Sequence, residues 1–128
     1  MLQFMGLQRH NHSLGVKHII YNPHIDLNGL ILSSGFEYFI NIYCTDLSIE
    51  EAHKGRLEGH NAPVVSCEFL DNSYMCVSVD EDANVRIWDT KLRLCLQMIT
   101  PNKKNVKVCG LLFMPKLNQY FVNYAVIV

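Results

Sequence analysis

The feature that most constrains this chain is an internal repeat of about 45 residues. Three segments share a polar first position, a branched or small apolar residue at the fifth, and an aromatic residue two places before a Pro or Asp: His12–Pro23, His60–Asp71 and Lys104–Pro115. Their starts lie 48 and 44 residues apart. Helical repeats of this length need amphipathic helices. The longest helix-compatible stretch, Leu47 to Lys54, is only about two turns long and has no sustained apolar face.

Each unit instead consists of short β-rich runs between polar turns. The runs in the second unit are Val64–Phe69, Tyr74–Val79, Val85–Trp88 and Leu94–Ile99, and those in the first are Val16–Tyr21, Leu30–Ser33 and Phe39–Tyr43. Asn28-Gly29 marks a turn between the first two runs of the first unit. This spacing predicts an all-β chain of four-stranded antiparallel units joined as meanders.

The second unit carries two dipeptides at a fixed interval. It reads GHNAPVVSCEFLDNSYMCVSVDEDANVRIWD from Gly59 to Asp89, and 27 residues separate His60 from Trp88. It resembles the WD-repeat family, in which Gly-His opens a propeller blade and Trp-Asp closes its third strand. The resemblance also matches a Ser ten residues before the Trp, here Ser78, and an Asp six before it, here Asp82.

The resemblance implies that His60, Ser78, Asp82 and Trp88 form a buried tetrad of hydrogen bonds. The chemistry fits, because an imidazole can accept from a hydroxyl at one nitrogen and donate to a carboxylate at the other. Ser78, His60 and Asp82 are also the residue types of a hydrolytic triad. Ser78 lies in the middle of a β-rich run without a glycine-rich elbow, so the pattern favours a structural role.

The first unit is a degenerate copy of this pattern. His12, Ser33, Glu37 and Tyr43 occupy its tetrad positions, but Tyr lacks the indole donor and Glu is one methylene longer than Asp. In the third unit Lys104 replaces the His.

The resemblance places the outermost strand of each blade just before the next Gly-His. The expected divisions are an outer strand of a preceding blade in 1–11, a degenerate blade in 12–58, a complete blade in 59–99 and a truncated blade in 100–128. Propellers close with about four to eight blades, so about two and a half blades do not close a ring. We expect the remaining blades to come from a longer chain or another subunit, and the isolated chain to self-associate.

Composition excludes several classes of function. The net charge is −1, from 11 basic and 12 acidic residues, which gives no basic surface for nucleic acid. No apolar run approaches the roughly 20 residues of a membrane-spanning helix, and no signal peptide is evident. The five cysteines are an odd number without a CxxC pair, which favours reduced thiols and a cytoplasmic location. Cys44, in an expected loop, should be the most reactive thiol.

The histidines near the N-terminus do not have the pattern of a metal site. His10, His12, His18 and His24 lack the short, paired ligand spacings of structural zinc, and no cysteine is close in sequence. The sequence therefore predicts neither a metal nor a cofactor.

The function that follows is a non-enzymatic protein–protein interaction scaffold. By resemblance, the face that contacts partners includes Asn61, Pro63, Glu81 and Phe36. A propeller enzyme with its active site in other blades and a non-functional truncation product remain alternatives. The runs SSGFEYFINIYCTDLSIEEAHKGRLEGHNAPVVS and DEDANVRIWDTKLRLCLQMI also resemble large WD-repeat proteins of cilia and flagella.

Overall fold

The computed structural model describes residues 13, 15–22, 29–45, 52–70, 74–101, 106–114 and 119–126. Side chains of 106–114 and 119–126 are outside this description, apart from Val108. The secondary structure in these ranges is strands and turns. None of these residues belongs to a helix long and apolar enough to cross a membrane.

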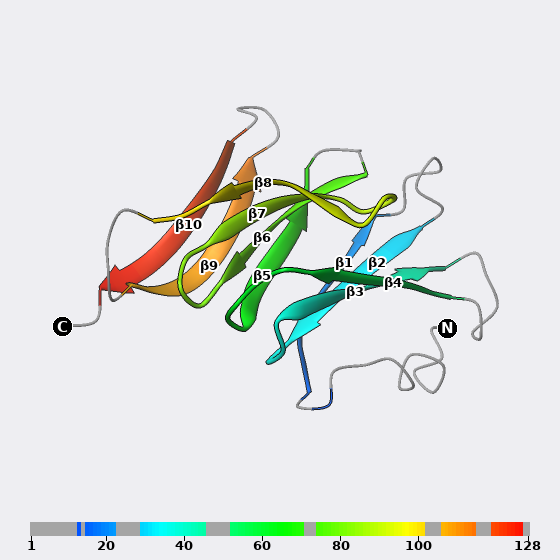
Figure 1. Cartoon of the computed structure of the whole chain (residues 1–128), viewed down its shortest axis with the longest axis horizontal. Helices are drawn as coiled ribbons and strands as arrows, with labels where there is room; N and C mark the ends of the chain where they lie inside the picture. Colours follow the sequence, from blue (N-terminus) through cyan, green and yellow to red (C-terminus); the bar gives the residue numbers. More distant parts are fainter. Residues whose placement is uncertain are drawn as a thin grey trace.

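Ten strands in the described ranges form three antiparallel sheets that stand side by side along the long axis of the molecule (Figure 1). The first sheet has the order β1 (Val16–Asn22), β2 (Leu30–Gly35), β3 (Phe39–Cys44), β4 (His53–Glu58). The second has the order β5 (Val64–Phe69), β6 (Met75–Asp80), β7 (Val85–Asp89), β8 (Leu94–Ile99). The third pairs β9 (Val106–Met114) with β10 (Gln119–Val126).

The all-β fold with four-stranded antiparallel units is therefore confirmed. The second unit has two strands with the expected bounds, β5 and β8. β4 does not stand out as a β-rich run, because its sequence HKGRLE is charged and contains glycine. The strand expected within 1–11 lies outside the described residues.

The sheets pack through their faces, with the first strand of each sheet next to that of its neighbour. β5 contacts β1 and β2 on one side and β9 on the other. One core cluster lies between the first and second sheets: Leu30, Leu32, Ile40, Ile42, Cys44, Leu57, Val64, Cys67, Cys76 and Trp88. The other joins the second sheet to β9: Val77, Val79, Ala83, Val85 and Val108.

The alternation of side chains explains why β6 belongs to both clusters. Successive residues of a strand point to opposite faces of a sheet. Cys76 therefore faces the first sheet, whereas Val77 and Val79 face the third. Since β6 is buried from Cys76 through Asp80, the second sheet has two faces that need covering.

At the outer edge, an arginine connects the first two sheets. Nη1 of Arg93, in the turn before β8, donates to the carbonyl oxygen of Lys54 in β4 at 2.6 Å. Gly55 makes this approach possible: a Cβ there would lie 2.8 Å from Arg93 Cδ, and its φ of +127° disfavours other residues. The contact joins the outer strand of one sheet to the turn of the next.

The exposure of the thiols shows that Cys44 does not lie in a loop, as the sequence led us to expect. Cys44 is the last residue of β3 and is buried, because the strand extends one residue beyond the predicted run. Cys95, in the outer strand β8, is exposed. Burial raises the pKa of Cys67 to about 12 and raises that of Cys76 well above its ordinary value.

We therefore expect Cys95 to react first with maleimide at neutral pH, and Cys44, Cys67 and Cys76 to react at least about tenfold more slowly. Thiolate is the reactive form, and both burial and a raised pKa suppress it. Labelling with isotope-coded maleimide, followed by peptide mass spectrometry, measures each rate. Uniform labelling of these four cysteines under native conditions would show that the sheets are not packed as described.

Candidate functional site: a buried hydrogen-bond chain and the rim beside it

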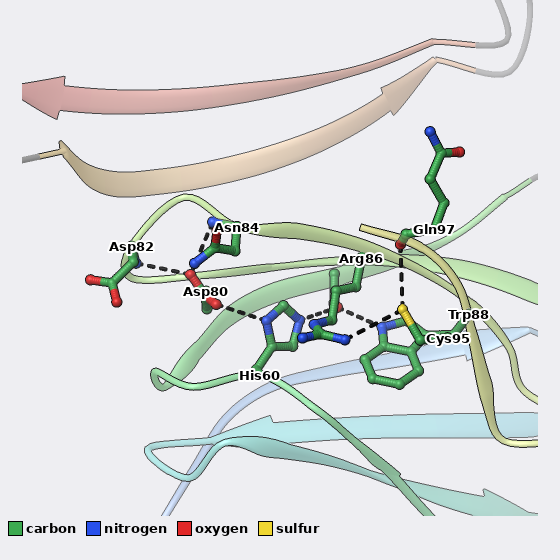
Figure 2. Close-up of polar contacts among 9 residues, drawn as sticks. His60, Asp80, Asp82, Asn84, Arg86, Trp88, Cys95 and Gln97 are labelled. Carbon is green, nitrogen blue, oxygen red and sulfur yellow. Dashed lines mark hydrogen bonds and ion pairs between the residues drawn. The ribbon is translucent and has the colours of Figure 1, made fainter. Parts of the chain in front are cut away.

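A continuous chain of hydrogen bonds crosses the face of the second sheet that packs against the first sheet. Trp88 Nε1 donates to Ser78 Oγ at 2.8 Å, and Ser78 Oγ lies 2.6 Å from His60 Nε2. His60 Nδ1 in turn lies 2.8 Å from Asp80 Oδ2. Figure 2 shows His60 between the Asp80 carboxylate and the Trp88 side of the sheet.

The direction of each bond follows from the donors available. The indole N–H only donates, so the Ser78 oxygen accepts it, and the Ser78 proton is directed to His60 Nε2. His60 then carries its proton on Nδ1 and donates it to Asp80. All four side chains are buried, so this order pairs the groups that would otherwise be orphaned.

The loop before β5 brings His60 into this position. Gly59 precedes it with φ +154°, and a Cβ at Gly59 would lie 2.9 Å from Arg86 Nη1 and 3.2 Å from Trp88 Cη2. The chain must pass close to these two side chains to bury the imidazole. A glycine before the histidine meets that requirement.

The carboxylate of the chain is Asp80, and the expectation of Asp82 is wrong. Asp80 ends β6 and stands two residues after Ser78, so both side chains point to the same face of the sheet. Its Oδ1 also accepts the backbone N–H groups of Asp82 at 2.9 Å and Asn84 at 3.0 Å. Asp82 lies in the turn with an exposed side chain (Figure 2).

The two-residue spacing from Ser78 is the sequence signal that identifies Asp80. The resemblance instead selects Asp82, because the family places an Asp six residues before the Trp. In this chain the turn includes Ala83 with φ +64°, a conformation that is uncommon for a residue with a side chain. The turn is closed by the Asp80 carboxylate and by the Ala83 N–H bond to the Asp80 carbonyl at 3.0 Å.

The geometry gives Ser78 no access to a substrate. Its side chain is fully buried, with Trp88 on one side of the hydroxyl and His60 on the other. A nucleophilic serine needs an exposed Oγ beside an oxyanion hole. The three residue types of a triad therefore act here as structural hydrogen-bond partners.

The matching positions of the first sheet differ from this chain at the residues that the structure describes. Tyr43 is buried, and its hydroxyl lies near the Ser33 side chain without a hydrogen bond of standard geometry. Burial raises the pKa of Tyr43, while the Ser33 side chain and the charge of Arg56 oppose this shift. Glu37 Oε1 accepts instead from Ser13 Oγ at 3.1 Å. His12 lies outside the described residues.

Two turns lie beside the loop that carries His60 and form a continuous surface with it. The Val64 N–H donates to the Glu37 carbonyl at 3.1 Å, and the Glu81 N–H donates to the Pro63 carbonyl at 3.0 Å. We call the surface formed by these two turns and this loop the upper rim, a name that does not refer to the orientation of Figure 1. It consists of Phe36, Glu37, Tyr38, Asn61, Pro63, Glu81 and Asp82.

The four residues predicted for partner contact, Phe36, Asn61, Pro63 and Glu81, belong to these turns and this loop, and their contact with a partner stays a prediction. Phe36 is 46% exposed, Asn61 is exposed, and Pro63 and Glu81 are partly exposed. Sequence reasoning missed Tyr38, which is 52% exposed two residues after Phe36. Its signal was an aromatic residue in a short turn, where burial is not expected.

Potential metal ligands do not gather in the part of the chain that the structure describes, where no three His, Cys, Asp or Glu side chains come together. His18 directs Nε2 to the carbonyl oxygen of Cys67 at 3.2 Å, which joins β1 to β5. His10, His12 and His24 lie outside the described residues.

Comparison with solved structures identifies the architecture. Neither a protein-family model nor a curated protein matches this sequence. The crystal structure of the C-terminal WD40 domain of Sif2 superimposes with a TM-score of 0.72 at 18% sequence identity, over 89% of this chain. This chain has the fold of part of a WD40 β-propeller. It spans 30% of the length of the Sif2 domain, and its sheets are blades that do not close a ring by themselves.

The assignment of Asp80 can be tested with a matched pair of substitutions. We expect Asp80→Asn to lower the free energy of unfolding by about 1–3 kcal/mol, because an amide cannot replace every bond of the buried carboxylate. Asp82→Asn, on the exposed turn, should change it by no more than about 0.5 kcal/mol. Urea denaturation followed by the fluorescence of Trp88, the single tryptophan, measures both. Equal losses in the two variants would contradict the assignment.

Proposed function

We propose that this chain is a non-enzymatic scaffold that binds other proteins through the upper rim. WD40 propellers generally act as platforms for protein interactions. In this chain the rim combines exposed aromatic side chains, Phe36 and Tyr38, with a backbone fixed by hydrogen bonds between turns. Aromatic residues supply much of the energy of protein interfaces.

The observation that carries this proposal is that hydrogen bonds connect the upper rim to the buried hydrogen-bond chain of Trp88, Ser78, His60 and Asp80. Asp80 belongs to the chain through Oδ2 and caps the β6–β7 turn through Oδ1. That turn bonds to Pro63, and the next residue, Val64, bonds to the turn that contains Phe36. A surface held in one conformation loses less entropy when a partner binds.

The remaining blades of the ring, in this proposal, come from a longer chain or from another subunit. The second sheet supports this, because each of its two faces is covered by a neighbouring sheet. A blade at either end of this row needs the same cover on its outer face. The resemblance to large ciliary and flagellar WD-repeat proteins leads us to propose that the parent protein works in the cytoplasm or the cilium. Imaging of the endogenously tagged protein in ciliated cells tests this location.

Site-specific photocrosslinking in cells tests the scaffold function. We expect p-benzoylphenylalanine at position 36 of the natural protein to crosslink one or a few defined proteins. The matched control is the same residue at position 92, because Leu92 is 61% exposed in the β7–β8 turn, at the opposite end of the blade. Crosslinks of equal yield and identity at both positions, or at neither, would contradict the proposal.

A further inference from the structure

The upper rim contains a cation site that the chain fills with its own lysine. Lys17 Nζ lies 4.7 Å from the centroid of the Phe36 ring. The face of an aromatic ring attracts a cation through its quadrupole. Lys17 and Phe36 are both exposed, so an external cation can compete for the same ring face.

Carboxylates outnumber cations in the turns and strand ends near this ring. In residues 13, 15–17, 35–39, 58–63 and 80–84, which form the upper rim and the strand ends next to it, Lys17 is the only lysine or arginine. Two further cations, Arg56 over the Phe39 ring and Arg86 beside Gly59, contact these segments from β4 and β7. The carboxylates in these ranges that are at least partly exposed are Glu37, Glu58, Glu81 and Asp82. Asp80 is buried against His60 and does not contribute to the surface charge. The field at the rim therefore favours a positively charged partner.

Apolar surface is available beside the cation site. Tyr38 is exposed in the same turn as Phe36, and Pro63 is bonded to the neighbouring turn through Glu81. A ligand that satisfied only the carboxylates would leave these side chains uncovered. The combination fits a peptide segment with a basic side chain next to an apolar one.

We propose that the upper rim binds a basic segment of a partner protein, in which a Lys or Arg side chain displaces Lys17 from the Phe36 ring. The neighbouring apolar side chain of the segment packs on Tyr38 and Pro63. Glu81 and Asp82 attract the segment by charge. This inference rests on the proposed scaffold function and specifies the chemistry of its partner.

Fluorescence anisotropy with a defined probe tests the inference on the natural protein with its remaining blades in place. The probe is a fluorescein-labelled peptide, Gly-Leu-Lys-Ser-Leu-Arg-Gly, and its control carries Glu in place of Lys and Arg. We expect the basic probe to bind at least tenfold more tightly than the acidic one, and less tightly as NaCl rises. Phe36→Ala and the double variant Glu81→Gln/Asp82→Asn should each weaken binding by about three- to tenfold.

The Lys17→Ala variant is the most discriminating test, because the inference predicts that it binds the basic probe more tightly, whereas the other variants bind it more weakly. Removing the internal competitor should tighten binding of the basic probe by about two- to fivefold. Leu92→Ala, on the opposite end of the blade, should leave the dissociation constant unchanged. Circular dichroism of each variant confirms that the strands remain formed.

Two results would overturn the inference: equal affinity for the basic and acidic probes, or weaker binding after Lys17→Ala. Either result, obtained while position 36 still crosslinks defined proteins in cells, would leave the scaffold function in place with a partner of different chemistry. Loss of both the crosslinks and the probe selectivity would remove the scaffold function as well.

Discussion

The buried chain from Trp88 through Ser78 and His60 to Asp80 is the interaction on which this blade depends. It joins three parts of the sheet: β7, β6 and the loop before β5. In a dry interior an unpaired polar group costs about 1–3 kcal/mol, so each member holds its neighbours in place. Asp80 extends the effect outwards, because the same carboxylate closes the β6–β7 turn. The buried hydrogen-bond chain therefore also positions the β6–β7 turn, which is part of the upper rim.

Packing on both faces makes the second blade dependent on its neighbours. Trp88 and Cys76 pack against the first sheet, and Val77 and Val79 pack towards β9. The polar chain lies on the first of these faces, so it is shielded from water by the neighbouring blade. At the outer edge the bond from Arg93 to Lys54 joins the same pair of blades. Inner and outer contacts together set the relation between the two sheets, and with it the continuity of the upper rim.

The sequence predicts the fold well where local pattern and burial agree. The repeat and the strands of the second unit follow from spacing and residue type, and the resemblance to the WD-repeat family supplies the partners His60, Ser78 and Trp88. Asp82 is the wrong carboxylate, because the position taken from the resemblance does not show which of the two aspartates in this turn bonds to His60 and caps the turn. Cys44 was misplaced in a loop because β3 continues one residue further. The charged strand β4 is stabilised by pairing with β3 and not by a β-rich sequence of its own.

The central claim is the direction of the hydrogen bonds through His60, and its tautomer is the most direct measurement of it. Long-range ¹H–¹⁵N correlation NMR of the ¹⁵N-labelled chain distinguishes the two ring nitrogens. The account predicts a proton on Nδ1, shared with Asp80, an unprotonated Nε2 that accepts from Ser78, and slow solvent exchange of the Nδ1 and Trp88 Nε1 protons. A His60 ring protonated on Nε2 instead, or rapid exchange of both protons, would contradict it.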